Sequence, residues 1–182
     1  MPARRALYFG RFQPFHKGHL AVVEWILSEL GVDEIVVLVG MASESYTFRN
    51  PFTAGERIEM IRLSFVDASI PLDRLITATL HTLETSIGCA QYVLSFVPRV
   101  DYVVIGNPSV AKIFEDSGAR VVRPPSFRRS EWNGTRIRLL MARGDPAWRD
   151  SLTPSTAEFI ESIGGPGRLS LLAASDAPGG NM

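Results

Sequence analysis

The chain has 182 residues, of which 46% are apolar, and it carries 19 basic and 19 acidic residues. This length fits a single domain, and the apolar content is sufficient for a packed core, which argues against intrinsic disorder. The balanced charge argues against a nucleic-acid partner, because proteins that bind a duplex usually carry a basic excess. A single cysteine excludes an intramolecular disulfide framework, and no apolar run reaches the roughly 18 residues of a membrane span. We therefore expect a cytoplasmic globular protein without a membrane partner.

Short apolar segments alternate with helical patterns along the whole chain. The expected strands cover residues 5–10, 33–40, 74–80, 101–106 and 119–125, and the expected helices cover residues 17–30, 53–65, 86–96, 109–118, 135–143 and 155–163. Thr53 and Glu56 form a capping-box pattern at the start of the second helix. Strands that alternate with helices predict an α/β fold with a parallel sheet and right-handed crossovers.

The ligands of such sheets bind beyond the carboxyl ends of the strands. Gly10, Gly40 and Gly106 each mark one of these ends, so we expect the functional residues to gather there. After residue 165 the sequence becomes rich in glycine, which predicts a partly flexible tail over residues 166–182. A short helix from Leu169 to Ala174 is compatible with this tail.

Two of the three histidines, His16 and His19, follow the first strand in the stretch HKGH. They fall where the first helix begins, and a helix start offers unpaired N–H donors and a positive dipole end to an anion. Arg11 adds a planar charged fork, and Gly18 lets a polyphosphate approach the backbone closely. The stretch therefore indicates a phosphate site.

The histidine pair has two other interpretations. A zinc site needs a third protein ligand, and outside this stretch only one histidine and one cysteine remain in the chain, so metal ligation is disfavoured. Histidines that cap the helix or pack against its first turn are the second alternative. The pair by itself does not separate phosphate binding from this capping role.

The stretch NGTRIR, residues 133–138, predicts a second helix start on the same edge of the sheet. Thr135 is the expected N-cap, with Arg136 and Arg138 in the first turn. Arginine there is disfavoured by the helix dipole unless an anion compensates it, which indicates a second anion-binding position. The alternative is a pair of solvated surface arginines.

Four stretches in this order, GRFQPFHKGH, RNPFTAGER, IGNPSV and NGTRIR, resemble the archaeal nicotinamide-mononucleotide adenylyltransferases of the nucleotidylyltransferase superfamily. The resemblance covers about residues 5–165, so we expect a nucleotidylyltransferase domain over residues 1–165. It implies a Rossmann-like sheet of the H-x-G-H type with helices on both faces, and a homohexamer. The implied reaction joins ATP and nicotinamide mononucleotide to give NAD and pyrophosphate, with Mg²⁺ on the ATP phosphates and no dedicated metal site in the protein.

The resemblance also implies roles for individual residues. His19 would contact the α-phosphate, where charge develops, and His16 would hold neighbouring phosphate oxygens. Arg11 and Arg138 would hold the β- and γ-phosphates that leave as pyrophosphate, and Arg49 would face the phosphates. The complete set expected to bind ATP is Gly10, Arg11, His16, Gly18, His19, Asn107, Thr135, Arg136 and Arg138. For Asn107, an Asn-Pro turn initiator is an equally good interpretation.

The acceptor half of the sequence departs from the family pattern. Thr82 stands where an aspartate is expected, and Cys89 stands where a tryptophan would stack on the nicotinamide ring. Tyr92 either supplies a ring face instead or belongs to the core, and Phe127 matches an aromatic residue near the nucleotide sites. The acceptor is therefore open between nicotinamide mononucleotide and another phosphorylated molecule such as nicotinate mononucleotide. A non-catalytic nucleotide-sensing domain is the third hypothesis.

Further residues near these motifs have less defined roles. Arg57 is expected to be a structural ion-pair partner, and Trp132 is expected to pack in the core. Arg128 and Arg129 are either phosphate neighbours or part of a solvated loop.

Overall fold

The computed structural model describes residues 2–81 and 88–175 of the chain. Its centre is a parallel sheet with the strand order β3-β2-β1-β4-β5. The strands are β1 (Arg5–Gly10), β2 (Glu34–Val39), β3 (Leu75–Thr79), β4 (Tyr102–Val104) and β5 (Val121–Val122). The α-helices are α1 (Lys17–Glu29), α2 (Ala54–Asp67), α3 (Cys89–Ser95), α4 (Pro108–Asp116), α5 (Gly134–Ala142), α6 (Pro154–Ser162) and α7 (Gly165–Ser175).

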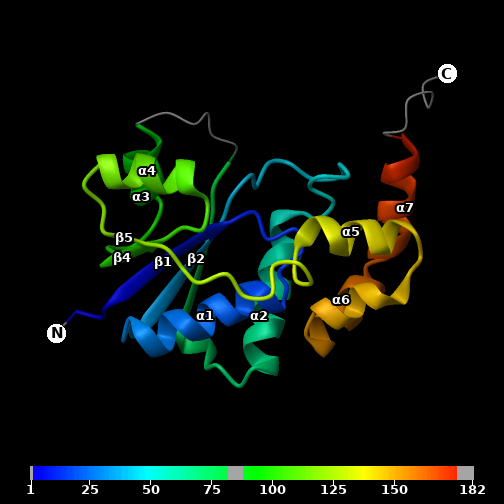
Figure 1. Ribbon diagram of the computed structural model, residues 1–182, viewed down its shortest axis with the longest axis horizontal. Helices are drawn as coiled ribbons and strands as arrows, with labels where there is room; N and C mark the ends of the chain where they lie inside the picture. Colours follow the sequence, from blue (N-terminus) through cyan, green and yellow to red (C-terminus); the bar gives the residue numbers. More distant parts are fainter. Residues whose placement is uncertain (1, 82–87, 176–182) are drawn as a thin grey trace.

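The sheet is covered on both faces because successive side chains of a strand point to opposite sides. Along β1, Ala6 and Tyr8 enter one core while Leu7 enters the other. The first core also contains residues of α1, α2, α5, α6 and α7, whereas the second contains residues of α3 and α4. Figure 1 shows α3 and α4 on one side of the sheet, with α1 and α2 on the other. The expected α/β fold with helices on both faces is confirmed.

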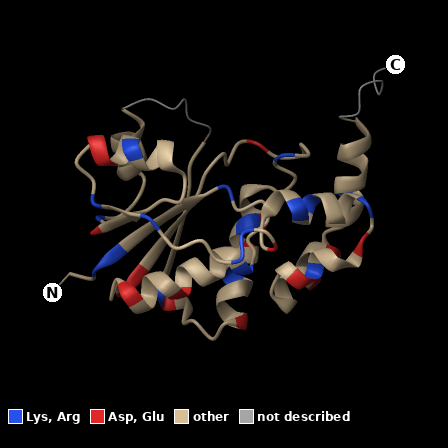
Figure 2. Cartoon of the chain, in the orientation of Figure 1, with Lys and Arg blue, Asp and Glu red and all other residues tan. Residues whose placement is uncertain are grey.

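The last three helices form a group beside α2 (Figure 1). Helix α7 packs against α5 through the fully buried Leu169, so the short helix compatible with the glycine-rich sequence is present and longer than expected. Residues 176–182 of the expected tail lie outside the described residues. Figure 2 shows basic and acidic positions interspersed along the chain. Within the described residues, no helix has the length and apolar character needed to cross a bilayer.

Most element boundaries agree with the expectation within a few residues. Strand β5 is the main difference, since it pairs only through Val121 and Val122. Pro124 and Pro125 follow, and proline has no N–H to donate to a ladder, which ends the strand early. Two 3₁₀ segments, Leu72–Arg74 and Pro146–Ser151, were not expected. Of the helix expected over residues 86–96, the first two residues lie outside the described part of the chain.

Candidate nucleotide-binding site

Two adjoining pockets lie between the start of α1 and the start of α5. The first, here called the arginine pocket, has a volume of about 190 Å³, and its lining includes Arg11, Thr135 and Arg138. The second, the aromatic pocket, has a volume of about 290 Å³, and its lining includes Tyr8, Gly106, Phe127 and Trp132. Both pockets are also lined by His16, His19 and Gly134, which therefore form the boundary between them.

The two histidines form a stacked pair at the start of α1. Their ring centroids are 3.7 Å apart, with 21° between the planes. The backbone N–H of His16, which is the N-cap, donates to Nδ1 of His19 at 3.3 Å. Because Nδ1 accepts this bond, the neutral His19 ring carries its proton on Nε2. The pair therefore takes part in the helix start, as the capping interpretation expects, and it also lines both pockets.

Burial keeps both imidazoles neutral in the unliganded protein. It lowers the pKa of His16 to about 3. The pKa of His19 lies well below its ordinary value, first because of burial and then because of the neighbouring His16. A neutral imidazole still has one N–H to donate, so the pair can offer hydrogen bonds to a phosphate without carrying charge itself.

Positive charge is supplied by three arginines near the arginine pocket. The pKa of Arg138 is lowered to about 10, first by burial and then by the nearby Arg11 and Arg49. The pKa of Arg11 is lowered by burial and by Arg49, while Glu44 opposes the shift. Arg49 itself is exposed. Arginines that lower one another's pKa repel each other, and an anion bound between them would offset this repulsion. The cluster therefore suits a polyphosphate.

Two buried polar atoms of this region lack a hydrogen-bond partner, namely His16 Nδ1 and Arg138 Nε. Buried polar atoms in folded proteins are nearly always paired, and exceptions often mark a functional position. Both residues line the arginine pocket. The unpaired atoms therefore indicate that this pocket is built to receive an oxygen-rich ligand.

Two glycines keep the backbone of the boundary accessible. A Cβ on Gly134 would lie 2.9 Å from the carbonyl oxygen of Gln13 and 3.1 Å from Arg138 Nη1. A Cβ on Gly18 would lie 3.1 Å from the His16 ring and 3.2 Å from Trp132 Cβ. A side chain at Gly134 would intrude where the two pockets meet, and one at Gly18 would crowd His16 and Trp132 in the aromatic pocket.

The start of α5 differs from the expectation in its cap. Asn133, not Thr135, is the N-cap, because it has extended backbone angles and its side-chain oxygen accepts from Arg136 N at 2.8 Å. Thr135 instead lines the arginine pocket and accepts from Arg138 Nη2 at 3.3 Å. Arg136 is exposed and lines a separate small pocket beside Asp150. The structure thus brings Arg138 and Thr135 to the site but turns Arg136 away from it.

Arg57 is structural, as expected, but it is not an ion-pair partner. It is fully buried, and its Nη1 donates to the carbonyl oxygens of Arg11 and Gly40, both at 2.8 Å. Its Nη2 and Nε donate to the carbonyls of Met41 and Thr53 at 3.1 Å. Burial, followed by the charge of Arg11, lowers the pKa of Arg57 to about 10. The side chain joins the loops that follow β1 and β2 to α2.

The loop before α5 forms one wall of the aromatic pocket. Phe127 and Arg129 line this pocket, as does Trp132, which was expected only to pack in the core. Arg128 lies over the Trp132 ring at 5.0 Å and pairs with Glu131 at 2.7 Å. Of the two loop arginines, Arg129 therefore belongs to the pocket, whereas Arg128 braces its outer side.

Comparison with known proteins identifies the fold family. A family model described as Cytidylyltransferase-like matches residues 7–139. The chain belongs to the cytidylyltransferase-like family. A protein of Aeropyrum pernix named only as uncharacterized is 64% identical over 94% of this chain and 99% of its own length. A second Aeropyrum pernix protein, named nicotinamide-nucleotide adenylyltransferase, is 44% identical over 91% of this chain and 95% of its own length.

Solved structures support the same fold. A bifunctional NMN adenylyltransferase/ADP ribose pyrophosphatase from Francisella tularensis superposes with a TM-score of 0.75 at 18% identity. The match covers 96% of this chain and 54% of the Francisella chain. The resemblance read from the four sequence motifs to archaeal nicotinamide-mononucleotide adenylyltransferases is confirmed.

The remaining expected residues of this cytidylyltransferase-like chain lie near or outside the two pockets. Asn107 is the N-cap of α4 and accepts from the backbone N–H groups of Ser109 and Val110, so its oxygen serves the turn. Gly10 ends β1 next to the Phe12 ring. Thr82 lies outside the described residues, and the half-buried Cys89 begins α3.

Tyr92 is not a core residue. Its side chain is 47% exposed and contacts Phe96 edge-to-face with ring centroids 4.8 Å apart. It lies on α3, which covers the face of the sheet opposite α1.

Several residues that shape the two pockets carry little or no signal in the sequence. Tyr8 was assigned only to a strand, and Gln13 and Gly134 were not singled out. The one usable signal was the glycine of NGTRIR, because Gly134 begins a helix and helix starts can accept an anion. Gln13 gave no local signal, because its partners lie far away in the sequence.

The described residues do not form a metal cage. Within residues 2–81 and 88–175, no group of three or more His, Cys, Asp or Glu side chains is placed to hold a metal ion. The arginine pocket instead presents guanidinium and imidazole N–H groups, which bind phosphate oxygens. These donors fit a nucleotide whose cation is held by phosphate oxygens and water.

Proposed function

We propose that this protein transfers the adenylyl group of ATP to the 5′-phosphate of nicotinamide mononucleotide, giving NAD and pyrophosphate. The observation that carries the proposal is the histidine pair at the boundary between a cationic pocket and an aromatic pocket. A nucleoside triphosphate has the matching form, with an aromatic base at one end and a polyphosphate at the other. Placing the nucleoside in the aromatic pocket puts the α-phosphate beside the histidines.

The reaction is an in-line displacement that needs no covalent enzyme intermediate. An oxygen of the mononucleotide 5′-phosphate forms a bond to the α-phosphorus, and the bond to the oxygen bridging to the β-phosphate breaks. Pyrophosphate leaves with that electron pair. The protein contributes positioning and stabilisation of the developing charge.

Each site residue has a part in this scheme. His19, with its proton on Nε2, donates to the α-phosphate, and His16 offers its N–H to adjacent oxygens. Arg11 and Arg138 hold the departing pyrophosphate, and the exposed Arg49 adds charge at the entrance. A divalent cation, Mg²⁺ in the expected case, supplies charge neutralisation on the phosphates when it is bound with ATP.

The same chemistry on another phosphorylated acceptor, such as nicotinate mononucleotide, is the second candidate. Of the two Aeropyrum pernix proteins compared with this chain, the more similar one does not carry the name nicotinamide-nucleotide adenylyltransferase. Cys89 also replaces the tryptophan expected in the acceptor half. An organism that has both a named adenylyltransferase and a protein more similar to this chain would not need two enzymes with the same acceptor. This favours a changed acceptor for the present chain.

Pyrophosphate release from ATP tests both candidates, measured with nicotinamide mononucleotide, nicotinate mononucleotide and a panel of other phosphorylated acceptors. Turnover with the first supports the main proposal, and a strong preference for a different acceptor replaces it with the second. Tight ATP binding without turnover on any acceptor would identify a nucleotide-sensing domain instead. From the family resemblance we also propose that the protein is cytoplasmic and forms a homohexamer. Light scattering of the purified protein tests the oligomeric state.

A further inference from the structure

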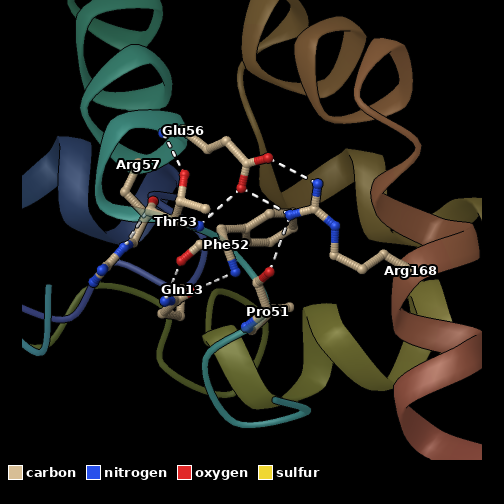
Figure 3. Close-up of polar contacts among 7 residues, drawn as sticks. All are labelled: Gln13, Pro51, Phe52, Thr53, Glu56, Arg57 and Arg168. Carbon is tan, nitrogen blue, oxygen red and sulfur yellow. Dashed lines mark hydrogen bonds and ion pairs between the residues drawn. The ribbon is translucent and has the colours of Figure 1, made fainter. Parts of the chain in front are cut away.

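Arg168 on the C-terminal helix α7 contacts the segment that leads into α2, where Gly165 also packs near the Phe52 ring. Arg168 donates from Nη1 and Nη2 to the two carboxylate oxygens of Glu56, both at 2.8 Å. Its Nη1 also donates to the carbonyl oxygen of Pro51 at 3.0 Å. Figure 3 shows this guanidinium between Pro51 and Glu56, with the ring of Phe52 beside it. A bidentate pair that also holds a main-chain carbonyl fixes a peptide more rigidly than a single ion pair.

The segment held by Arg168 is the one that orients the two arginines of the arginine pocket. Asn50, only 1% exposed, accepts from Arg11 Nη1 at 3.4 Å. Two residues later, both backbone polar groups of Phe52 bond to the Gln13 side chain, at 2.9 and 3.1 Å. The main-chain oxygen of Gln13 in turn accepts from Arg138 Nη1 at 2.7 Å. A series of contacts therefore connects α7 to Arg11 and Arg138. Every group in this series is buried or half-buried.

We propose that Arg168 is a positioning residue for the pyrophosphate end of ATP, and that α7 is thereby a working part of the enzyme. The inference rests on the proposed function, since it assigns Arg11 and Arg138 to the departing phosphates. Arg168 does not reach either pocket, so it acts by holding the peptide from Asn50 to Thr53. It also lies outside residues 7–139, the part shared with the cytidylyltransferase-like family model.

The surroundings of Arg168 favour this role over ordinary helix docking. Docking of α7 is already served by apolar contacts, with Leu169 fully buried and Gly165 packed closely against Ile160. The Arg168 guanidinium also lies 4.6 Å from the centre of the Tyr46 ring, so its direction is fixed from a second side. The Glu56 carboxylate serves at the same time as the capping-box acceptor for Thr53 N at 2.8 Å.

The experiment compares Arg168→Gln and Arg168→Lys with wild-type protein. Binding of inorganic pyrophosphate and of ATP is measured by calorimetry, and KM and kcat are measured for ATP and for the acceptor. Lysine keeps the charge but cannot form the bidentate fork. We expect both variants to bind pyrophosphate and ATP roughly tenfold more weakly. A loss of this size is what a small displacement of the groups that bind the ligand can produce. The KM of the acceptor should not change.

A matched control is Arg149→Gln, which removes another arginine–glutamate pair of the C-terminal region, that of Arg149 with Glu161. This pair is exposed and joins Arg149 to α6, not to the segment held by Arg168, so the control should bind pyrophosphate like wild type. If Arg168→Gln fails to fold, Arg168→Lys and Glu56→Gln decide the matter by the same measurements.

The outcomes separate this inference from the proposed function. If folded Arg168 variants bind pyrophosphate and ATP like wild type, or lose affinity only as much as the Arg149 control, the positioning role is wrong while the proposed function stands. If the wild-type protein binds neither ATP nor pyrophosphate, the proposed function itself fails. Unequal effects, with ATP affinity reduced and acceptor KM unchanged, support the role of Arg168.

Discussion

Individual residues of the site combine a structural and a chemical role. His16 is the N-cap of α1, lines both pockets and has a buried, unpaired Nδ1, while His19 accepts a backbone bond on one nitrogen and keeps its other N–H for a ligand. Arg138 likewise holds the Gln13 carbonyl and retains an unpaired Nε. Because each side chain is also held by a structural contact, the fold fixes the direction of its donor. Donors fixed in advance can stabilise the charge of a transition state without having to reorient during the reaction.

Replacement of His19 by alanine tests the transition-state role. A donor that acts most strongly as charge builds on the α-phosphate contributes to kcat more than to ATP affinity. We expect His19→Ala to lower kcat by about 10²–10³ while the dissociation constant of ATP changes little. Steady-state kinetics with the best acceptor, together with calorimetry of ATP, measure the two effects. Near-normal turnover of a folded His19→Ala protein would contradict the assignment.

The buried neutral His16 makes stability depend on pH. Its folded pKa of about 3 lies below the ordinary value of 6.5, so the unfolded chain binds a proton that the native protein does not. Stability is therefore fully present above about pH 6.5 and falls as the pH is lowered toward 3. Each such histidine contributes up to about 1.4 kcal/mol per pH unit.

Urea unfolding between pH 6.5 and 5, where carboxylates are still ionised, measures this dependence. His16→Gln should lose less free energy of unfolding over this range than wild type. His81→Gln, which removes an exposed histidine, is the control variant. Equal slopes for wild type and His16→Gln would show that His16 is not held neutral by burial.

At the scale of elements, the site is made where the starts of two helices meet. The loop after β1 carries Gln13, and the start of α5 carries Gly134 and Arg138, which contact that loop directly. Neither helix start would form a pocket alone. The close backbone approach at Gly134 is what brings the histidine pair and Arg138 within reach of one ligand.

Gly134→Ala tests this approach. The added Cβ would meet the Gln13 carbonyl oxygen at 2.9 Å, and backbone cannot move aside as a flexible side chain can. We expect a stability loss of about 1–3 kcal/mol, typical of overpacking, and clearly weaker ATP binding. Gly55→Ala in α2 is the matched control, because its Cβ would meet nothing within 4 Å. Thermal unfolding and ATP calorimetry of both variants provide the comparison, and equal behaviour would disprove the close-approach argument.

At the scale of the whole molecule, a buried cation holds the layers together below the site. The guanidinium of Arg57 satisfies carbonyl groups after β1, after β2 and at the start of α2. Each of these segments carries or borders a site residue. One fully buried arginine thus joins three chain segments that are not paired with one another as strands.

Arg57→Met is expected to lower the free energy of unfolding by about 2–4 kcal/mol, because several buried carbonyl oxygens lose their donor. Arg62→Met on the exposed side of the same helix is the control and should change stability little. Chemical unfolding of the two variants measures the difference. A small effect of Arg57→Met would mean that water replaces the guanidinium without cost.

Much of the fold and part of the site could be predicted from the sequence because their signals are local. The apolar run of residues 33–40, the Thr53–Glu56 capping box and the HKGH helix start each depend on neighbours within a few positions. The alternation of such elements was enough to predict a parallel sheet and to place the functional edge at its glycines. The predicted cap of α5, Thr135, was wrong: Asn133 caps the helix, and the backbone angles that decide this are not visible in the sequence.

Tertiary structure alone decided which side chains serve the site, since those contacts join distant positions. Gln13 and Arg138 are separated by 125 positions, and Arg168 and Glu56 by 112. The sequence does not show whether an arginine is held by carbonyl oxygens, as Arg57 is, or paired with a carboxylate. The sequence by itself determined the local elements and the two helix starts that border the pockets. The partners of the buried polar groups were decided by the packing of those elements, because a hydrogen-bond partner is specified by position in space and not by any pattern along the chain.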